Sequence, residues 1–314
     1  MSIKKWIESF SPVTLTSAFS SVTLGFAVAW YKTNKIDPLF YIITLLGILA
    51  AQAGVNLIND YTDYKSGVDM LYRKSGFFHR PNAVLDLDLP PSQVKNVGYF
   101  LLGIALVCGI YLAVAVGIPI IIIGIIGIFL GIAYSEPPFK LKYRGLGELI
   151  AGITMGPLVV WGSFVVQTGD ILSLYPLLVG IINGAFTFLI LLGSSSLKME
   201  ASRELGKKTI VLVLGLKKLR YAVYSTIIVM YLSLVISALL NYLPLLSLIS
   251  LVLVPRTVKL SSPLLSGSEE YIKSKWKELR KLWAGPFSVR LIILIIILLS
   301  IIITRELHIF TFAW

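Results

Sequence analysis

The sequence contains few of the residues that build metal, haem or disulfide sites. Its 314 residues include a single cysteine, Cys108, and two histidines, His79 and His308. One cysteine excludes a disulfide framework within the chain, and these three positions lack the spacing of a zinc or haem site. Because Cys108 lies in an apolar segment, we expect it to be a small core residue.

Charged residues are also scarce, at 14% of the sequence, whereas 56% of the residues are apolar or aromatic. In soluble globular proteins about a quarter of the residues are charged. The apolar residues form long blocks, such as 120–132 and 291–303, without the alternating polarity of a transmembrane barrel. The composition therefore excludes an ordinary soluble globule and predicts an all-α, polytopic bundle of membrane helices.

Apolar runs of about 20 residues predict nine membrane spans in a single domain covering residues 1–314. They lie near 13–31, 38–58, 97–115, 117–134, 145–166, 173–193, 220–239, 242–254 and 286–304. The span at 242–254 is short and bounded by Pro244 and Pro255, so a half-helix or an interfacial segment is the alternative there. The main loops on one side are expected at 59–96, 194–219 and 255–285.

The basic residues test this topology, because Lys and Arg of membrane proteins gather on the cytoplasmic side. With nine spans, all but three of the 28 Lys and Arg fall on the side of the N-terminus, Arg290 near the start of the last span included. The exceptions are Lys32, Lys35 and Arg305. We therefore expect a multi-pass protein of the cell membrane with a cytoplasmic N-terminus and an external C-terminus. The net charge of +12 then reflects topology, and no basic surface indicates a nucleic-acid partner.

Polar residues at the mouth of a membrane helix are costly and mark candidate functional sites. The strongest group follows the second span and comprises Asn56, Asn59, Asp60, Asp63 and, further on, Asp69. The first four recur at spacings of three and four residues, so they share one face of a continuing helix. Carboxylates this close repel one another unless a cation lies among them, and such oxygen ligands suit Mg²⁺ bound together with phosphate. A solvated, acidic helix end is the alternative interpretation.

Three stretches of the chain carry a resemblance to a known family. They are NLINDYTDYKSGVD at 56–69, SEPPFKLKYRGLGE at 135–148 with its continuation to Gly169, and GKKT to LG at 206–215. Together they resemble the UbiA superfamily of membrane prenyltransferases, most closely the menaquinone-pathway branch that prenylates 1,4-dihydroxy-2-naphthoate. The first stretch resembles the first aspartate-rich motif of that family.

The resemblance implies a bundle around a central chamber, in which two Mg²⁺ ions between two aspartate-rich motifs hold the diphosphate of a polyprenyl donor. Asp60, Asp63 and Asp69 would then be catalytic, and these three together with Asn59 would bind Mg²⁺. Candidates for contacts to the donor are Asn56, Asn59, Lys65, Arg73, Lys74, Lys140, Lys142, Arg144 and Lys198. For each basic residue, a role in fixing the topology alone is the alternative.

The second aspartate-rich motif of the family is missing from this chain. Counting back from Gly206, the positions of its Asn and two Asp hold Ser194, Lys198 and Ser202. Lys198 then has three interpretations. Its ammonium takes the place of a cation among the first-motif carboxylates, contacts the diphosphate beside one Mg²⁺, or reaches out toward the cytoplasm.

Two functions of different classes follow. The first is a Mg²⁺-dependent enzyme that transfers a polyprenyl group from polyprenyl diphosphate to an aromatic quinone precursor. The second is a catalytically inactive UbiA-like protein that binds an isoprenoid quinone or lipid, as a subunit of a larger membrane assembly such as a respiratory complex. The resemblance favours the first and the missing motif favours the second, with Mg²⁺ binding weak or absent if Lys198 replaces the cation.

Overall fold

A computed structural model describes residues 2–74, 80–135, 138–266, 268, 274 and 276–306. This part of the chain is helical apart from its turns and loops and a single parallel bridge between Arg144 and Lys208. The α-helices are α1 (Ile3–Ser9), α2 (Pro12–Thr33), α3 (Pro38–Lys65), α4 (Val68–Lys74), α5 (Pro91–Val116), α6 (Ile118–Ser135), α7 (Gly147–Ile153), α8 (Val159–Thr168), α9 (Tyr175–Leu197), α10 (Met199–Glu204), α11 (Ile210–Leu214), α12 (Leu216–Leu239), α13 (Val254–Leu265) and α15 (Trp276–Glu306). Two 3-10 segments, η1 (Leu141–Tyr143) and η3 (Leu245–Leu253), and a π segment, η2 (Thr154–Leu158), complete the set.

The membrane-bundle prediction is confirmed. Within the described residues, eight helical segments are long and apolar enough to cross a bilayer, and the shorter apolar helix Ile118–Tyr134 adds a ninth. The prediction for 242–254 is wrong at its C-terminal end, because η3 runs on into α13 as one 21-residue segment, Leu245–Leu265. Pro255 does not end the helix, since it stands in the first turn of α13, where no backbone N–H is needed. Arg256 and Lys259, expected in the loop 255–285, therefore lie on α13.

Helix α9 occupies the middle of the bundle and packs against α2, α7, α8, α12 and α15. Its crossing with η2 is close enough to require glycine, because a Cβ on Gly156 would lie 2.4 Å from the Cα of Gly184. A Cβ on Gly184 would in turn lie 2.5 Å from the carbonyl oxygen of Gly152. Small residues of this kind let membrane helices approach through their backbones.

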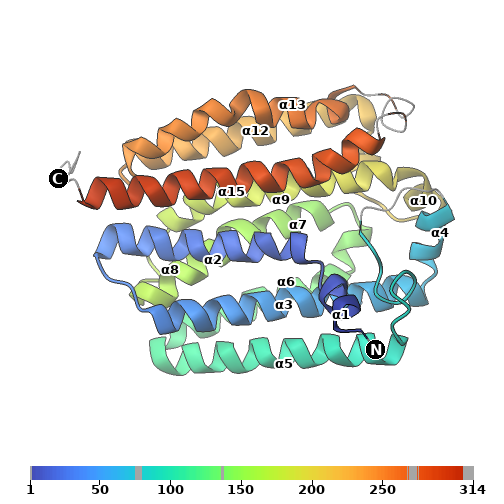
Figure 1. The fold of residues 1–314 in the computed structure, drawn as a ribbon, viewed down its shortest axis with the longest axis horizontal. Helices are drawn as coiled ribbons and strands as arrows, with labels where there is room; N and C mark the ends of the chain where they lie inside the picture. The colour runs from blue at the N-terminus through green and yellow to red at the C-terminus, as the bar shows by residue number, and fades with distance from the viewer. Residues whose placement is uncertain are drawn as a thin grey trace.

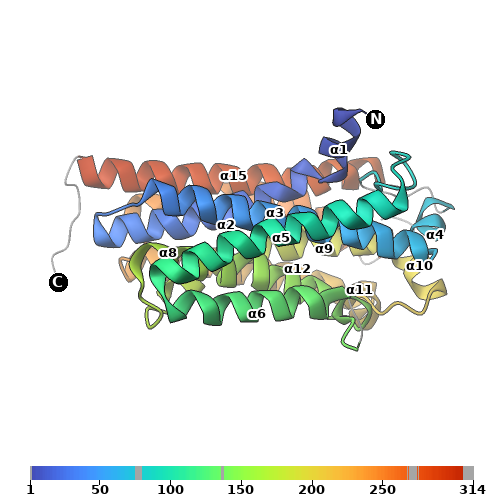
Figure 2. The same cartoon turned by 90° about the horizontal axis from the view of Figure 1, so that it is seen from below.

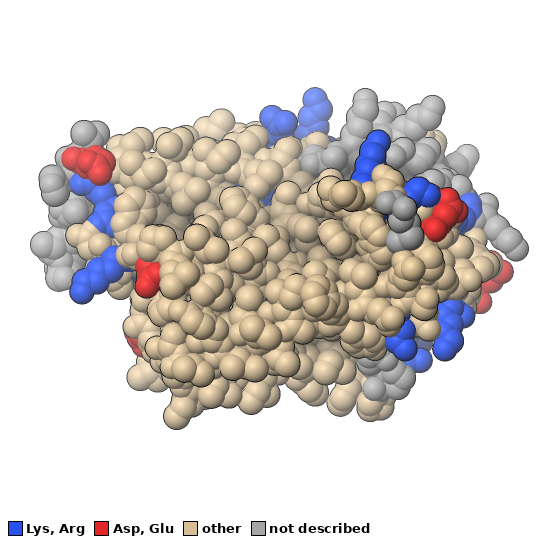
Figure 3. Space-filling view, turned by 60° about the horizontal axis from the view of Figure 1, so that its bottom comes forward, with Lys and Arg blue, Asp and Glu red and all other residues tan. Residues whose placement is uncertain are grey.

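The outer surface of the bundle is apolar. Helix α5 lies on the opposite side of the bundle from α12 and α13, and the view from below shows α5 and α6 along this outer face (Figures 1 and 2). Large side chains such as Val107, Val114, Ile118 and Ile125 are exposed there. In the space-filling view, the front of the middle region is uncharged, and charged residues appear toward the two ends and at the upper edge (Figure 3). This is the surface expected of a protein surrounded by lipid.

The two ends of the bundle differ in content. Helices α1, α4 and α10 lie at one end, and α15 finishes at the other (Figure 1). Lys32 and Lys35, near the turn from α2 to α3, belong to the second end, as does Arg305, whose guanidinium donates to the Trp30 carbonyl at 2.8 Å. The three cations predicted to lie opposite the others thus share one end. Which end faces the cytoplasm remains a prediction.

Candidate functional site

Polar side chains converge at the end of the bundle where α3, α4, η1 and α10 meet. Their partners come from the segment after α4 and from the residues on either side of α10. We call them the polar cluster: Asn59, Asp60, Asp63, Asp69, Tyr72, Arg73, Arg80, Asn82, Asp86, Lys142, Tyr143, Lys198, Ser202 and Lys207.

Helix α3 delivers the acidic face of the cluster. Asp37 caps its start by accepting from the N–H groups of Leu39 and Phe40. The helix then runs without interruption to Lys65, so that residues 59, 60 and 63 lie within about one turn. Gly67 follows with φ +77°, a left-handed conformation that favours glycine and lets the chain turn into α4.

Asp60 is buried and fully paired. Arg80 donates from Nη1 to Asp60 Oδ2 at 3.0 Å and from Nη2 to Oδ1, and the Ala83 N–H donates to Oδ2 at 2.9 Å. Burial alone would lower the pKa of Arg80, but its ion pair with Asp60 outweighs burial and raises that pKa above its usual value. Both oxygens of Asp60 are therefore occupied by groups of the chain itself.

Asp69 and Arg73 are tied to the segment that supplies Arg80. The side-chain amide of Asn82 donates to Asp69 Oδ2 at 2.5 Å. Arg73 Nε donates to Asp86 Oδ1 at 2.7 Å, and the Asn82 N–H donates to Asp86 Oδ2 at 2.6 Å. Sequence reasoning missed Arg80, Asn82 and Asp86. The available signal was the turn residue Asn82, whose side chain accepts from the N–H groups two and three residues on and orders this segment.

Asp63 faces η1 instead. Lys142, whose side chain is 6% exposed, places Nζ 3.1 Å from Asp63 Oδ1 and 3.1 Å from Asn59 Oδ1. The Tyr143 hydroxyl donates to the same Asp63 oxygen at 3.0 Å. Burial lowers the pKa of Lys142, and Asp63 opposes that shift by favouring the ammonium form.

Two further lysines approach Asp63 across tyrosine rings. Lys198 Nζ lies 4.4 Å from the centroid of the Tyr72 ring, and Lys207 Nζ lies 5.0 Å from that of Tyr143 and 3.5 Å from the Tyr72 hydroxyl. Burial lowers the pKa of Lys198 to about 8. We call Lys142, Lys198 and Lys207 the lysine trio. Lys207 was not predicted as a site residue. It lies beyond α10, the short helix that follows Lys198.

The other predicted site residues lie apart from the cluster. Asn56 donates to the Phe10 carbonyl at 3.2 Å and to Thr14 Oγ1 at 3.0 Å, so it joins α3 to the α1–α2 junction. Lys65, Lys140 and Arg144 are exposed, and Arg144 donates to the carbonyl of Pro138. The Lys74 side chain lies outside the described residues. Of the predictions, the structure brings together Asn59, Asp60, Asp63, Asp69, Arg73, Lys142 and Lys198.

As arranged here, the cluster does not fit the two Mg²⁺ ions that the sequence resemblance implies. Its four carboxylates face five cationic side chains, and Ser202, at a position expected to hold an acid, hydrogen-bonds to the Tyr72 hydroxyl at 3.1 Å. Within the described part of the chain, no three His, Cys, Asp or Glu side chains are grouped as metal ligands. Lysines over aromatic rings provide charge for an anion, which is the ligand that this donor set suits.

Comparison with known sequences finds a family match over most of the chain. Residues 18–283 match the model of the UbiA prenyltransferase family. The chain is 30% identical over 206 residues to 1,4-dihydroxy-2-naphthoate octaprenyltransferase of Bacillus subtilis, an alignment that covers 66% of this chain and 64% of that enzyme. It is also 30% identical over 259 residues to 2-carboxy-1,4-naphthoquinone phytyltransferase of Synechocystis, which covers 82% of this chain and 81% of that protein.

Solved structures resemble the whole bundle. A UbiA homolog from Archaeoglobus fulgidus, bound to DMAPP and Mg²⁺, superposes with a TM-score of 0.62 at 14% identity and covers 92% of this chain and 99% of its own. A UbiA homolog from Aeropyrum pernix in its apo form gives a TM-score of 0.63 at 14% identity, with coverage of 92% and 98%. At such identities the likeness establishes the fold alone.

Proposed function

The chain belongs to the UbiA prenyltransferase family, and on that premise we propose that it transfers a polyprenyl group from a polyprenyl diphosphate to an aromatic quinone precursor. One observation carries the proposal. The lysine trio surrounds Asp63 at one end of an apolar bundle, with Tyr72 and Tyr143 between the ammonium groups. The naphthoate and naphthoquinone substrates named for its relatives support an aromatic acceptor.

The trio suits the diphosphate of the donor. Ammonium groups act as compact point charges for phosphate oxygens, and the five cationic side chains of the polar cluster outnumber its four carboxylates by one. Lys142 is buried and Lys198 is half-buried, and reduced contact with water strengthens the attraction of an ammonium group for an anion. An isoprenoid chain attached to the diphosphate would extend among the apolar helices, where its burial is favourable.

The reaction breaks the allylic C–O bond of the donor and one bond at the ring carbon, and it forms one C–C bond. The allylic C–O bond of the donor breaks, the electron pair leaves with the diphosphate, and an electron-rich ring carbon forms the new C–C bond to the allylic carbon. That ring carbon then loses a substituent as a cation, a proton in the simplest case. The trio would stabilise the charge that develops on the departing diphosphate, a contribution that is usually the largest in such sites.

The missing second motif favours one other function. Ser194, Lys198 and Ser202 supply no carboxylates, and Asp60 is occupied by Arg80. An inactive family member that holds an isoprenoid quinone or lipid in the bundle, as part of a larger membrane assembly, is consistent with these features. It predicts binding of a quinone without turnover.

Turnover by the purified protein decides between these functions. The full chain, in lipid nanodiscs, is incubated with octaprenyl diphosphate and 1,4-dihydroxy-2-naphthoate, and prenylated product is measured by mass spectrometry. We expect product from the wild type. Lys142→Met and Lys207→Met should each lower kcat/KM tenfold or more, because each removes a positive charge that would stabilise the departing diphosphate.

Lys65→Met and Lys140→Met are the matched controls, since each removes an exposed cation from the same region of the chain. Both should retain activity close to that of the wild type. No product with any prenyl diphosphate, together with a quinone that copurifies in stoichiometric amount, would establish the inactive alternative. Equal losses of activity in the trio and control variants would contradict a specific role of the lysine trio.

A further inference from the structure

A second charged site lies inside the bundle, away from the polar cluster. Arg290, counted from the sequence among the cytoplasmic cations, stands in the first turns of the membrane segment Pro286–Glu306 and is only 3% exposed. It therefore does not contribute to a basic surface. Ionisable residues buried in membrane helices are costly and mark functional positions.

The guanidinium of Arg290 is poorly satisfied. Its Nη2 donates to Thr16 Oγ1 at 2.6 Å, and its Cζ lies 4.8 Å from the centroid of the Phe287 ring. Its Nε and Nη1 have no hydrogen-bond partner among the described residues, and no described Asp or Glu forms an ion pair with it. A buried cation with no counter-charge costs several kcal/mol, so the fold gains if an anion binds there.

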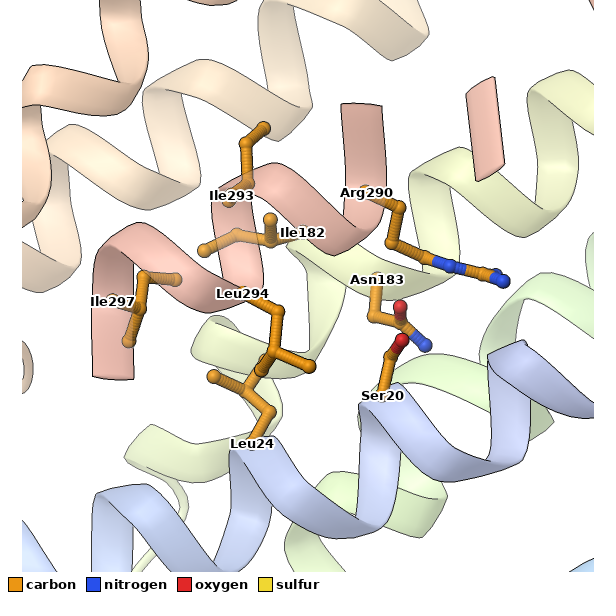
Figure 4. A pocket seen from close by; sticks show the side chains of 8 residues that line it. All are labelled: Ser20, Leu24, Ile182, Asn183, Arg290, Ile293, Leu294 and Ile297. Carbon is orange, nitrogen blue, oxygen red and sulfur yellow. The ribbon is translucent and has the colours of Figure 1, made fainter. Parts of the chain in front are cut away.

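Arg290 lines a narrow cavity that has a polar and an apolar part. Figure 4 shows Ser20, Asn183 and Arg290 on one side of it. The aliphatic side chains on the other side are Leu24, Ile182, Ile293, Leu294 and Ile297. These residues come from α2, α9 and α15, so the cavity lies between three membrane helices.

Asn183 adds a second unpaired group of opposite character. Its amide nitrogen is used, with a donation to the Met155 carbonyl at 2.8 Å, while its Oδ1 is buried with no partner among the described residues. The cavity therefore offers two N–H donors from Arg290 and one acceptor from Asn183. A ligand that satisfies all three carries an anionic acceptor and a hydroxyl donor on an otherwise apolar body.

We propose that Arg290 and Asn183 form a binding site for the carboxylate and a hydroxyl group of an apolar hydroxycarboxylic acid. Each fork of the planar guanidinium pairs Nη2 with either Nε or Nη1, so a carboxylate takes an unused N–H of Nε or Nη1 together with the second N–H of Nη2, whose first N–H is bound to Thr16. The hydroxyl donates to Asn183 Oδ1, and the hydrocarbon part lies against the aliphatic side. The cavity volume is about 10 Å³, so binding of the hydrocarbon part requires that α2 and α15 move apart.

The site lies close to the polar cluster along α2. Arg80 of the cluster donates to Ser11 Oγ at 3.0 Å, and Arg290 donates to Thr16. Ser11 immediately precedes α2 and Thr16 lies in the first turns of that helix, so the two contacts are about two helical turns apart or less. The identification of the ligand as the ring that receives the prenyl group rests on the proposed function, whereas carboxylate binding at Arg290 does not.

Thermal unfolding of the purified full chain in detergent tests the site with three probes. They are 1,4-dihydroxy-2-naphthoate, naphthalene-1,4-diol, which lacks the carboxylate, and oleate, which has a carboxylate but no ring. We expect the naphthoate to raise the unfolding midpoint and the diol to raise it far less. Arg290→Met should weaken naphthoate binding tenfold or more, while the midpoint without ligand stays equal or rises, because an unpaired buried charge is removed.

Arg290→Lys keeps the charge and loses the planar fork, so it should also bind the naphthoate more weakly and remains informative if Arg290→Met fails to fold. Arg305→Met is the control, since Arg305 belongs to the same helix but stacks 4.7 Å from the Trp30 ring at the far end. A shift with oleate alone would overturn the hydroxycarboxylic-acid proposal and assign the site to a lipid carboxylate. Unchanged naphthoate binding in both Arg290 variants, or equal shifts with the diol, would overturn the proposal. Prenylation of the naphthoate with wild-type kinetics in both Arg290 variants would overturn this site and leave the proposed function intact.

Discussion

The polar cluster and the Arg290 cavity bury charge in opposite ways. In the cluster, Asp60 pairs with Arg80, Asp86 with Arg73 and Asp63 with Lys142, so that each of these acids has a cation within 4.0 Å. In the cavity a single cation meets one hydroxyl and no acid among the described residues. The two sites contact the start of the same helix: Arg80 binds Ser11, which immediately precedes α2, and Arg290 binds Thr16 in the first turns of α2.

The contrast distinguishes buried charges that stabilise the fold through ion pairs from buried charges that are available to bind a ligand. A buried ion pair whose oxygens are all engaged resists rearrangement, because the loss of one partner strands the other in a medium of low polarity. An unpaired buried guanidinium destabilises the bundle, and binding of an anion would offset that cost. The Asp60–Arg80 pair is therefore structural, whereas Lys198, Lys207 and Arg290, for which no ion pair is seen among the described residues, hold the charge that is available to substrates.

The largest effect on stability is expected when the Asp60–Arg80 ion pair is broken. Arg80→Met leaves Asp60, which is 2% exposed, without its cation, and should lower the free energy of unfolding by about 3–5 kcal/mol. Thermal unfolding of the purified protein in detergent measures the loss. The double variant Asp60→Asn with Arg80→Met should regain most of it, since an amide still accepts from the Ala83 N–H. A wild-type midpoint for Arg80→Met alone would contradict the structural role.

Restoring the missing acids should convert the cluster into a metal site. The variant Ser194→Asn, Lys198→Asp, Ser202→Asp removes one cation and adds two carboxylates, so negative charge becomes dominant. We expect EDTA to reduce wild-type turnover by less than about twofold and that of the triple variant by more than about tenfold. Lys198→Met, which removes the cation without adding acid, is the control and should gain no dependence on Mg²⁺. Equal EDTA sensitivity in the wild type and the triple variant would show that the trio does not replace the metal.

The pH dependence of donor binding tests whether the Lys198 ammonium binds the diphosphate. The pKa of Lys198 lies at about 8, so its ammonium is present at pH 7 and is lost as the pH rises above 8. If the ammonium binds diphosphate, KM for the donor should rise by up to about tenfold per pH unit above 8. Lys198→Arg keeps its charge throughout and should abolish the rise. The same rise in both proteins would assign the dependence to another group.

The sequence predicted the helices well because membrane spans depend on length and hydropathy alone. Nine apolar runs became nine helical segments, and the short run at 242–254 was cut off too early only because Pro255 was taken as a terminator instead of a first-turn residue. The shared face of Asn59, Asp60 and Asp63 also followed from helical spacing.

The partners of those residues were not predictable, since they depend on tertiary contacts. Arg80 reaches Asp60 from a segment twenty residues further on, and Lys142 reaches Asp63 from seventy-nine residues away. Arg290 was counted among the cations on the N-terminal side, and nothing in the sequence indicated that its side chain is buried. Its burial depends on how α15 packs against α2, which composition does not encode.

The smallest effect is expected where charges pair in solvent. Lys5 and Asp88 approach to 3.3 Å, but their side chains are 42% and 81% exposed. Asp88→Asn should change the free energy of unfolding by less than about 1 kcal/mol, and added salt should reduce the difference further. Asp88 has φ +54°, a conformation that Asn also tolerates, so the substitution changes the charge without straining the backbone. A loss of stability as large as that of Arg80→Met would mean that burial does not set the cost of breaking an ion pair in this protein. The distinction between the polar cluster and the Arg290 cavity would then fail.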